Sequence, residues 1–478
     1  MRRAQPARPA ADAAGAMTST HSASAGRVPS GGHSKRVRLG ERFWRLWWAT
    51  ALSSTGDGLV GMVALPLLAL TMTHSAVLIA GVTAANRASA ALATLPAGLL
   101  TDRRDRRSLM AASELLPGLV LGGLVVAMSL RVADLAMVYA AAVVVAVCEV
   151  TYKLALQAVF PDVVASRDQL AVGNGRLMSV DAAGEQVIGP AVGGFLFSAA
   201  QRLPFLADAV SFVTSAVLVR ASVPAAPNPA APNPAEQPVG DVAGSPSAVQ
   251  PAEDGKGPQA PSAHKSKPTW RDDLRTGFRV FNSNLSLKLL AGAVSAGSFN
   301  QNMVIALVVI YGRHVLSLSS TGYGAFLAGA AVLGVVGLFF GGAAQRRLGA
   351  SGVVIVGSLA CGLSYLGMSA AGLAWLAAVA FGLQELGTAV INVGSVTTRQ
   401  QIIPKELFGR VGSVHRLFVQ TAAPAGAIVG GLIADAWGVR SALLVAGVLE
   451  LLLIGVLTPA LRRNLPGVAV PSQPAATP

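Results

Sequence analysis

The sequence predicts an all-α membrane protein with twelve transmembrane helices in two pseudo-symmetric halves of six helices each. Hydrophobic residues make up 53% of the 478 residues and charged residues only 13%, against about 25% charged residues in an average soluble domain. Apolar runs of the length that crosses a bilayer, roughly 20 residues, recur along the chain. The second half repeats features of the first at an offset near 240 residues. This composition argues against a soluble enzyme and against a disordered protein.

The apolar runs are joined by short polar segments except at one place. We expect spans at about 43–72, 76–100, 108–130, 133–157, 173–199, 203–221, 285–311, 320–344, 351–370, 373–398, 408–434 and 440–461. The one long interruption begins with a Pro/Ala-rich stretch that cannot form a packed core. It ends, from Pro268 to Asn284, with apolar residues at helical spacing, which favours a helix on the membrane surface. The expected domains are a disordered cytoplasmic tail (1–42), an N-terminal half (43–221), a cytoplasmic linker (222–284), a C-terminal half (285–463) and a disordered tail (464–478).

Positive charge is spread unevenly between the two sides of the predicted bundle. The formal net charge of +14 would by itself also fit nucleic-acid binding. If the N-terminus is cytoplasmic, most lysines and arginines lie in tails, linker and inner loops, and Lys153 and Arg167 flank the loop after span four. The outer loops offer only Arg131, Arg202, Arg313 and Arg440. This distribution is typical of the positive-inside rule. We therefore expect a multi-pass protein of the cytoplasmic (plasma) membrane, with both termini cytoplasmic, in contact with the lipid bilayer and not with nucleic acid.

The two halves resemble each other in sequence. The stretch GLLTDRR from Gly98 aligns with GGAAQRR from Gly341 at an offset of 243, and VGG at 192–194 aligns with VGG at 429–431 at an offset of 237. A parallel repeat of six-span halves predicts a pseudo-two-fold axis along the membrane normal. Substrate is then expected to bind at mid-membrane between the halves, with access alternating between the two sides.

Ionisable side chains deep in the spans are the first candidates for function. Each costs about 2.5–3.5 kcal/mol at mid-span on insertion scales. Asp57 in span one and Arg87 in span two lie near the middle of their spans and could reach a common depth. They form either an inert structural pair or a transport pair in which Asp57 exchanges protons or contacts a cationic substrate. Glu185 in span five and Glu385 in span ten are further candidates for carrying protons.

Other polar residues in the spans are expected to have different roles. Asn300 and Gln301 in span seven are candidate substrate contacts, because amides at mid-span are costly unless they face a cavity. Glu114 and Asp208 lie closer to span ends and are expected to be solvated or structural, and Glu450 is expected to be peripheral.

Span five combines glycine and proline in the sequence GPAVGG, which includes Gly189, Pro190, Gly193 and Gly194. Proline removes a backbone donor and loosens a helix, while glycines allow neighbouring helices to approach closely. The segment serves either helix packing alone or a kink that controls leak and the direction of exchange.

No soluble catalytic constellation is present in the sequence. It lacks a phosphate-binding GxxxxGK[ST] motif, so direct drive by ATP is not supported. Its six histidines show no metal-ligand spacing. We expect no enzymatic activity, no metal and no cofactor.

Several stretches resemble one transporter family, the major facilitator superfamily. GLLTDRRDRR (98–107) resembles the loop signature of that superfamily, with Asp105 where the family usually has glycine, and GPAVGG resembles the signature of its antiporters. FLADAVSF (205–212) and RQQIIPKELFGRVGSV (399–414) are similar to its bacterial efflux branch, which includes macrolide and enterobactin exporters. The resemblance covers about 43–463.

The resemblance also implies a gating loop. Its residues here are Gly98, Asp102, Arg106, Arg107 and Glu149. In the superfamily the matching aspartate contacts a helix N-terminus of the other half, and an arginine pairs with an acid on span four. We expect Asp102 against the start of span eleven and Arg106 or Arg107 against Glu149. The alternative is that these residues only determine topology and loop structure.

The function implied is secondary active transport by alternating access. We expect a monomeric antiporter that couples protons to the efflux of a small amphipathic or cationic compound, such as a drug, an antibiotic or a secondary metabolite, and that confers drug resistance. A nutrient uptake carrier of the same fold is an alternative. A non-transporting membrane sensor or a lipid-moving protein is an alternative of another class.

Overall fold

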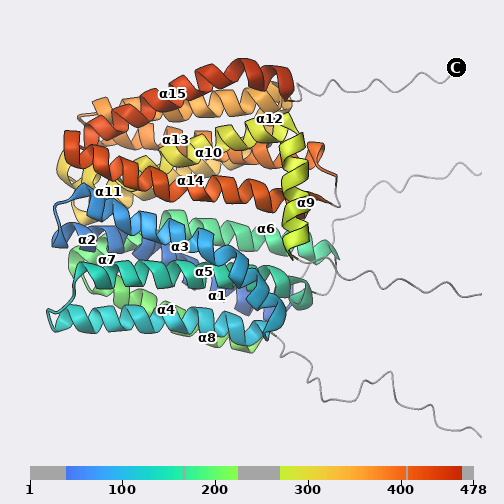
Figure 1. The fold of residues 1–478 in the computed structure, drawn as a ribbon. Coiled ribbons are helices and arrows are strands. Elements are labelled where there is room, and N and C mark those ends of the chain that lie inside the picture. The colour runs from blue at the N-terminus through green and yellow to red at the C-terminus, as the bar shows by residue number, and fades with distance from the viewer. Residues whose placement is uncertain (1–38, 165–166, 224–269, 405–406, 466–478) are drawn as a thin grey trace, which may run out of the picture. The chain divides into compact units, whose positions relative to one another are not determined.

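The helices of the chain form two groups that lie side by side, one from each half of the sequence (Figure 1). The computed structural model describes residues 39–164, 167–223, 270–404 and 407–465. The side chains of Asp102, Arg167, Asp168, Ala171 and 270–274 are not among those described. All described helices belong to the unit of the chain that begins at Leu39. Both expected tails, apart from a few residues next to the first and last spans, and most of the expected linker lie outside the described residues.

The N-terminal half contains the first six spans, two of which are interrupted by a π-helical turn. Span one consists of α1 (Glu41–Leu59), the π-helical turn η1 (Val60–Ala64) and α2 (Leu65–Met72). Spans two to four are α3 (Ala76–Arg103), α4 (Arg106–Ser129) and α5 (Leu135–Val163). Span five consists of α6 (Arg167–Ala183), the π-helical turn η2 (Gly184–Ile188) and α7 (Gly189–Ala199), and span six is α8 (Leu203–Ser222).

The C-terminal half repeats this arrangement after a connecting helix, α9 (Trp270–Ser283). Span seven consists of α10 (Leu285–Ile305), α11 (Val308–Ile310) and the π-helical turn η4 (Tyr311–Val315). Spans eight and nine form one continuous segment, α12 (Ser320–Ala370), which is broken at Gly349, where φ is 70°. Spans ten to twelve are α13 (Ala374–Ile402), α14 (Phe408–Trp437) and α15 (Val439–Asn464).

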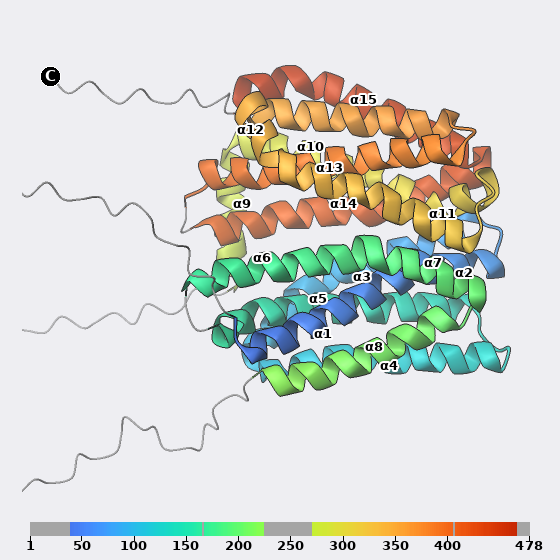
Figure 2. The ribbon, with the colours of Figure 1, turned by 180° about the vertical axis from the view of Figure 1, so that it is seen from behind.

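The twelve spans predicted from the sequence are confirmed. In the described part of the chain, 10 helical segments are long and apolar enough to cross a membrane, and α12 supplies two spans among them. The fifth span is not one of the 10, and its first segment, α6, carries charged side chains such as Arg176 and Asp181. The start of α1 and the end of α15 lie at the same end of the bundle, here named the termini end, and the opposite end is named the distal end (Figure 2).

Side-chain caps define where several helices begin. Asp105 Oδ2 accepts a hydrogen bond from Ser108 N at 2.9 Å at the start of α4, and Asp134 Oδ1 accepts one from Met137 N at 2.9 Å at the start of α5. Such a cap satisfies a backbone N–H that has no partner within the helix. Asp105 has φ −58°, so the loop does not require glycine at this position.

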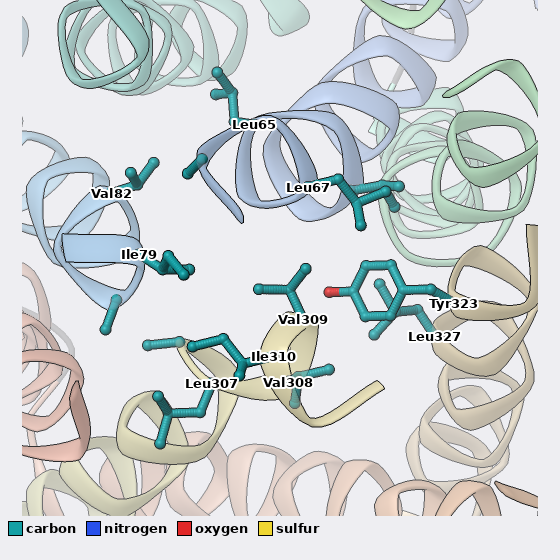
Figure 3. Packing of buried hydrophobic residues seen from close by; sticks show 14 of the residues in the cluster. Leu65, Leu67, Ile79, Val82, Leu307, Val308, Val309, Ile310, Tyr323 and Leu327 are labelled. Carbon is teal, nitrogen blue, oxygen red and sulfur yellow. The ribbon is translucent and has the colours of Figure 1, made fainter. Parts of the chain in front are cut away.

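The largest apolar core lies at the distal end and contains residues of both halves (Figure 3). Its members include Leu65, Leu67, Ile79 and Val82 of the N-terminal half and Leu307, Val308, Val309, Ile310, Tyr323 and Leu327 of the C-terminal half. The other three buried clusters lie towards the termini end, and each is confined to one half. Within the described residues, the apolar core therefore joins the halves at the distal end and not at the termini end.

Glycines bring the backbones of the two halves into contact at the distal end. A Cβ on Gly194 would lie 2.4 Å from Ser320 O and 2.9 Å from Gly324 Cα. A Cβ on Gly431 would lie 2.8 Å from Val77 Cα. Gly431 follows Gly194 by 237 positions, the offset of the VGG repeat. The repeat in the sequence thus corresponds to two equivalent contacts, α7 with α12 and α14 with α3.

The connecting helix α9 lies crosswise at the termini end (Figure 1). A Cβ on Gly277 would lie 2.5 Å from Arg410 O of α14, and the ring of Phe281 stacks on that of Phe418, with centroids 5.3 Å apart. A helix therefore occupies the place of the expected amphipathic segment. Of the apolar side chains described on it, Phe278 is exposed but Phe281 is buried against α14 rather than facing a membrane surface.

The close approach at Gly194 gives a first testable prediction. In Gly194→Leu the new side chain overlaps the backbone of α12, and overpacking of this kind costs typically about 1–3 kcal/mol. We expect a clear fall in the thermal unfolding midpoint of the purified protein. The midpoint is measured by size-exclusion chromatography of samples heated to a series of temperatures.

Gly123→Leu is the matched control, because a Cβ at Gly123 in α4 meets no atom within 4 Å. Equal midpoints for the two variants would contradict the tight α7–α12 contact.

Candidate functional site

A cavity of about 420 Å³ lies within the N-terminal half, towards the termini end. Its walls come from α1, α4, α5 and α6, with Phe212 of α8. The ionisable side chains that line it are the carboxyl groups of Asp57, Glu114, Glu149 and Asp181 and the ammonium group of Lys153. Hydroxyl groups and apolar side chains such as Leu177 complete the lining. The cavity therefore offers apolar contact together with four carboxyl groups against one cation.

Lys153 is the centre of the ion pairs at this site. Its Nζ lies 2.7 Å from Glu149 Oε1 on the same helix, 3.1 Å from Glu185 Oε2 and 3.8 Å from Asp181 Oδ2. The Lys153 side chain is 35% exposed, so these pairs are only partly desolvated. One ammonium group thus ties α5 to span five through the carboxyl groups of Asp181 and Glu185 and also pairs with Glu149 on its own helix.

Three further carboxyl groups lie around α1 with hydrogen-bonding capacity left unused. Glu114 Oε1 accepts a hydrogen bond from Ser53 Oγ at 3.1 Å, and Asp208 Oδ1 accepts one from Ser211 Oγ at 2.9 Å. Glu114 Oε2, Asp208 Oδ2 and Asp57 Oδ1 are buried without a hydrogen-bond partner. A buried carboxyl oxygen in this situation is costly unless it binds a proton or a ligand.

Glycines in spans one and five make room for this cluster. Gly56 lies against the Asp208 carboxyl group, which a Cβ would overlap, and a Cβ on Gly58 would lie 2.1 Å from Glu185 O. Gly184 begins the turn η2 and lies against α1, where its Cβ would be 2.5 Å from Ser54 Oγ. The close packing of span five on span one therefore positions Glu185 beside Asp57.

The structure does not pair Asp57 with Arg87. Arg87 is exposed on α3 and is not among the residues that line the cavity. Asp57 interacts electrostatically with Lys153 and with neighbouring carboxyl groups instead. The expected Asp57–Arg87 pair is wrong in this structure, and Lys153 is the cation of the site. Glu149 and Lys153 lie one helical turn apart near the end of an apolar run, a spacing typical of an ion pair; this signal in the sequence could have identified Lys153.

Burial of the other acids also differs from the expectation. Glu114 and Asp208 are each 1% exposed and Glu450 is 3% exposed, so the expectation that Glu450 is peripheral and the option that Glu114 and Asp208 are solvated are wrong. Position along a span indicates depth in the membrane, but it does not show which way the helix turns the side chain.

The C-terminal half holds a second polar cluster, in which an amide contacts a carboxyl group. Asn300 is fully buried, and its Nδ2 donates to Glu450 Oε2 at 2.6 Å. Gln301 and Glu385 are half-buried, and Glu385 packs against Gly334 of α12. The Asn300 amide therefore contacts Glu450 rather than an open cavity.

The residues of the expected gating loop are only partly brought together. Arg106 Nη1 donates to Ala158 O at 3.1 Å and lies 3.7 Å from Asp162 Oδ2, whereas Glu149 pairs with Lys153. The expected pairing of Arg106 with Glu149 is therefore not formed, because Arg106 reaches the end of α5 and Glu149 lies more than two turns deeper. Arg107 Nε is buried without a partner. A Cβ on Gly98, in α3, would meet no atom within 4 Å. The Asp102 side chain lies outside the described residues.

The Gly-Pro segment of span five is irregular, as its composition indicates. The turn η2 (Gly184–Ile188) directly precedes Gly189 and Pro190. Proline has no backbone N–H to donate within a helix. A π-helical turn before it changes the hydrogen-bond pattern of the helix from i→i+4 to i→i+5 at this place. Cβ atoms on Gly189 and Gly193 would lie 2.6 Å from Thr55 O and 2.8 Å from Leu59 O. The segment combines helix packing with an interruption of the helix.

The ion pairs of Lys153 give a second prediction. Lys153→Met leaves three carboxyl groups without their cation and should cost about 1–3 kcal/mol, less than the full value for a buried pair because the lysine is partly exposed. We expect a lower thermal unfolding midpoint, restored by adding Glu149→Gln and Glu185→Gln, whose amides need no cation. The control is Arg45→Met, which removes an exposed pair with Glu41 and should change the midpoint little. A loss as small as that of the control would contradict the structural role of Lys153.

Comparison with known proteins identifies the family. A sequence model of the Major Facilitator Superfamily matches residues 46–374 and 289–476. No curated protein sequence matches the chain significantly. Among solved structures, a bacterial homolog of the human lysosomal transporter Spinster, in an inward-facing conformation, is 15% identical over 89% of this chain and 97% of its own, with a TM-score of 0.66.

Two other solved structures are similar to the chain at this level. The nucleoside transporter NupG is 11% identical over 88% of this chain and 99% of its own, with a TM-score of 0.64. A bacterial homologue of the iron transporter ferroportin, also inward-facing, is 16% identical over 88% of this chain and 100% of its own, with a TM-score of 0.59. At these identities the structures share the fold. The family match covers both halves, and the chain belongs to the major facilitator superfamily, a family of membrane transporters.

Proposed function

We propose that the chain is a proton-coupled exporter of a small cationic or amphipathic compound, working by alternating access. The observation that carries this proposal is the cavity in the N-terminal half, where four carboxyl groups face one lysine beside apolar side chains. Carboxylates attract a cation more strongly in a partly desolvated site than in water. The same carboxyl groups can exchange a cation for protons, which is the step an antiporter requires.

The side on which the cavity lies supports export as the direction of transport. The arginines at the termini end include Arg103, Arg104, Arg106, Arg107, Arg346, Arg347, Arg399, Arg462 and Arg463, against Arg131, Arg202, Arg313 and Arg440 at the distal end. By the positive-inside rule, the termini end is cytoplasmic in the plasma membrane. The apolar core covers the distal end, which supports access to the cavity from the termini end, as the loading step of an exporter requires.

Each cluster has a role in the proposed exchange. Without substrate, Lys153 neutralises Glu149 and Glu185, and an entering cation competes with it for these carboxyl groups. Asp57, which lines the same cavity as Glu114, carries protons between the two sides. In the C-terminal half, Gln301 and Glu385 contact the substrate once the halves close around it.

The loop and the interrupted helix supply the conformational part of the cycle. Asp102 closes the termini end against the start of α14 in the state opposite to this one, and Arg106 holds the loop to the end of α5. The π-helical turn before Pro190 allows α6 to move relative to α7, which stays packed on α12.

Everted membrane vesicles test the proposal with tetraphenylphosphonium and ethidium as probe cations. Export appears as uptake of a probe into vesicles with an acidic interior. We expect this uptake with the wild-type chain and its fall to background in Asp57→Asn, because an amide cannot exchange protons. Glu41→Gln, on the surface of α1, should transport like the wild type at equal protein levels.

Other outcomes identify the alternatives. Proton-driven probe uptake by Asp57→Asn at wild-type rates would exclude Asp57 as the proton carrier. Uptake of a nutrient by right-side-out vesicles, without cation export, would favour the uptake carrier. Absence of any gradient-coupled flux across a broad panel of compounds would favour the sensor or lipid-moving protein.

A further inference from the structure

One carboxylate connects the two halves at the distal end. Asp435, in the last turn of α14, accepts hydrogen bonds from Ser75 Oγ at 2.7 Å, from Val77 N at 3.2 Å and from Ala76 N. All three donors belong to the start of α3, in the other half of the chain. We name this set of contacts the Asp435 cap.

The Asp435 cap uses a general property of helix ends. The first backbone N–H groups of a helix have no partner within it and carry a partial positive charge, which a carboxylate stabilises. Such a group normally comes from the residue just before the helix, and here Ser75 also occupies that position. Asp435 comes instead from another helix of the other half. Gly431, one turn earlier, lets α14 approach close enough for this contact.

The pseudo-symmetric position lacks the carboxylate. Ser198 precedes Asp435 by 237 positions, as Gly194 precedes Gly431, and Ser319 follows Ser75 by 244. Ser198 and Ser319 line a distal cavity of about 650 Å³ beside the start of α12. Ser319 Oγ caps α12 by itself, accepting from Gly322 N at 3.0 Å. The same helix contact therefore occurs twice, but a carboxylate crosses between the halves in only one copy.

We propose that Asp435 is a positioning residue of the transport cycle. Its carboxylate holds α14 to the start of α3 and stabilises the state that is closed at the distal end. Opening of the distal end separates these helices and breaks the Asp435 cap. Because Asp435 does not line the acidic cavity, this role does not depend on which substrate is carried or in which direction.

Distances between spin labels test the proposal. In a chain with Cys148→Ala and Cys361→Ala, one label pair at Val132→Cys and Leu373→Cys reports the distal end, and another at Arg220→Cys and Arg463→Cys reports the termini end. Removing a helix cap changes an equilibrium by a factor on the order of five. We expect Asp435→Ala to shift the population by about this factor towards a wider distal end and a narrower termini end.

Two further variants keep the test independent of simple destabilisation. Asp134→Ala removes a cap at the same end, but that cap lies within one half, so it should leave both distances unchanged. Ser198→Asp places a carboxylate at the start of α12 and should shift the population the other way, towards a closed distal end.

Distances in Asp435→Ala that match the wild type, or an equal shift in Asp134→Ala, would overturn the proposal. If Asp435→Ala does not fold, Asp435→Asn and Ser198→Asp decide, and the absence of a shift in both would overturn it. The distances are measured without substrate or gradient. A failed export assay therefore leaves this result unaffected.

Discussion

A charged group inside a membrane protein needs a partner, and Lys153 meets this constraint with three ion pairs. Its ammonium group pairs with carboxyl groups from its own helix and from span five. Removing one member of such a set leaves a charge without its partner in a partly desolvated site. The packing of span five on span one, with its glycines and its π-helical turn, keeps these partners together. The acidic cavity depends on that packing.

The two halves have similar folds but different charge. In the N-terminal half, ionisable groups meet ionisable groups, and several carboxyl oxygens remain without partners. In the C-terminal half, Asn300 satisfies Glu450 with an amide donor. A buried carboxyl group that accepts a hydrogen bond from a neutral amide is already satisfied. A buried carboxyl oxygen without a donor still needs a proton or a cation. Among the described residues, the buried carboxyl oxygens without a hydrogen-bond partner therefore lie in the N-terminal half.

The contact between the halves is built from small residues and apolar side chains rather than from ion pairs. Gly194 and Gly431 lie in equivalent backbone contacts, and one core cluster surrounds them. Contacts of this kind need little desolvation of charge and can separate without leaving buried ions behind. The Asp435 carboxylate is exposed at the edge of this contact, where water can take over its hydrogen bonds when the halves part.

The sequence alone determined the number, order and length of the spans, because a bilayer requires roughly 20 apolar residues wherever a helix crosses it. It also showed the repeat and the irregular span five, since offset and composition are properties of the chain itself. It identified Asp57 and Glu185 as costly residues inside spans. The contact partners of these residues could not be predicted from the sequence. A residue's position in a span gives its depth in the membrane but not the rotation of one helix against the next.

Rotation and packing are what only the tertiary structure decided. They placed Lys153 rather than Arg87 beside Asp57, buried Glu114 and Asp208 behind α1, and turned Asn300 towards Glu450. They also brought Asp435 to the start of α3, where it contacts Val77, a residue 358 positions away in the sequence. Such contacts join helices far apart in the chain, so they are set by how the helices pack and not by any local pattern of residues.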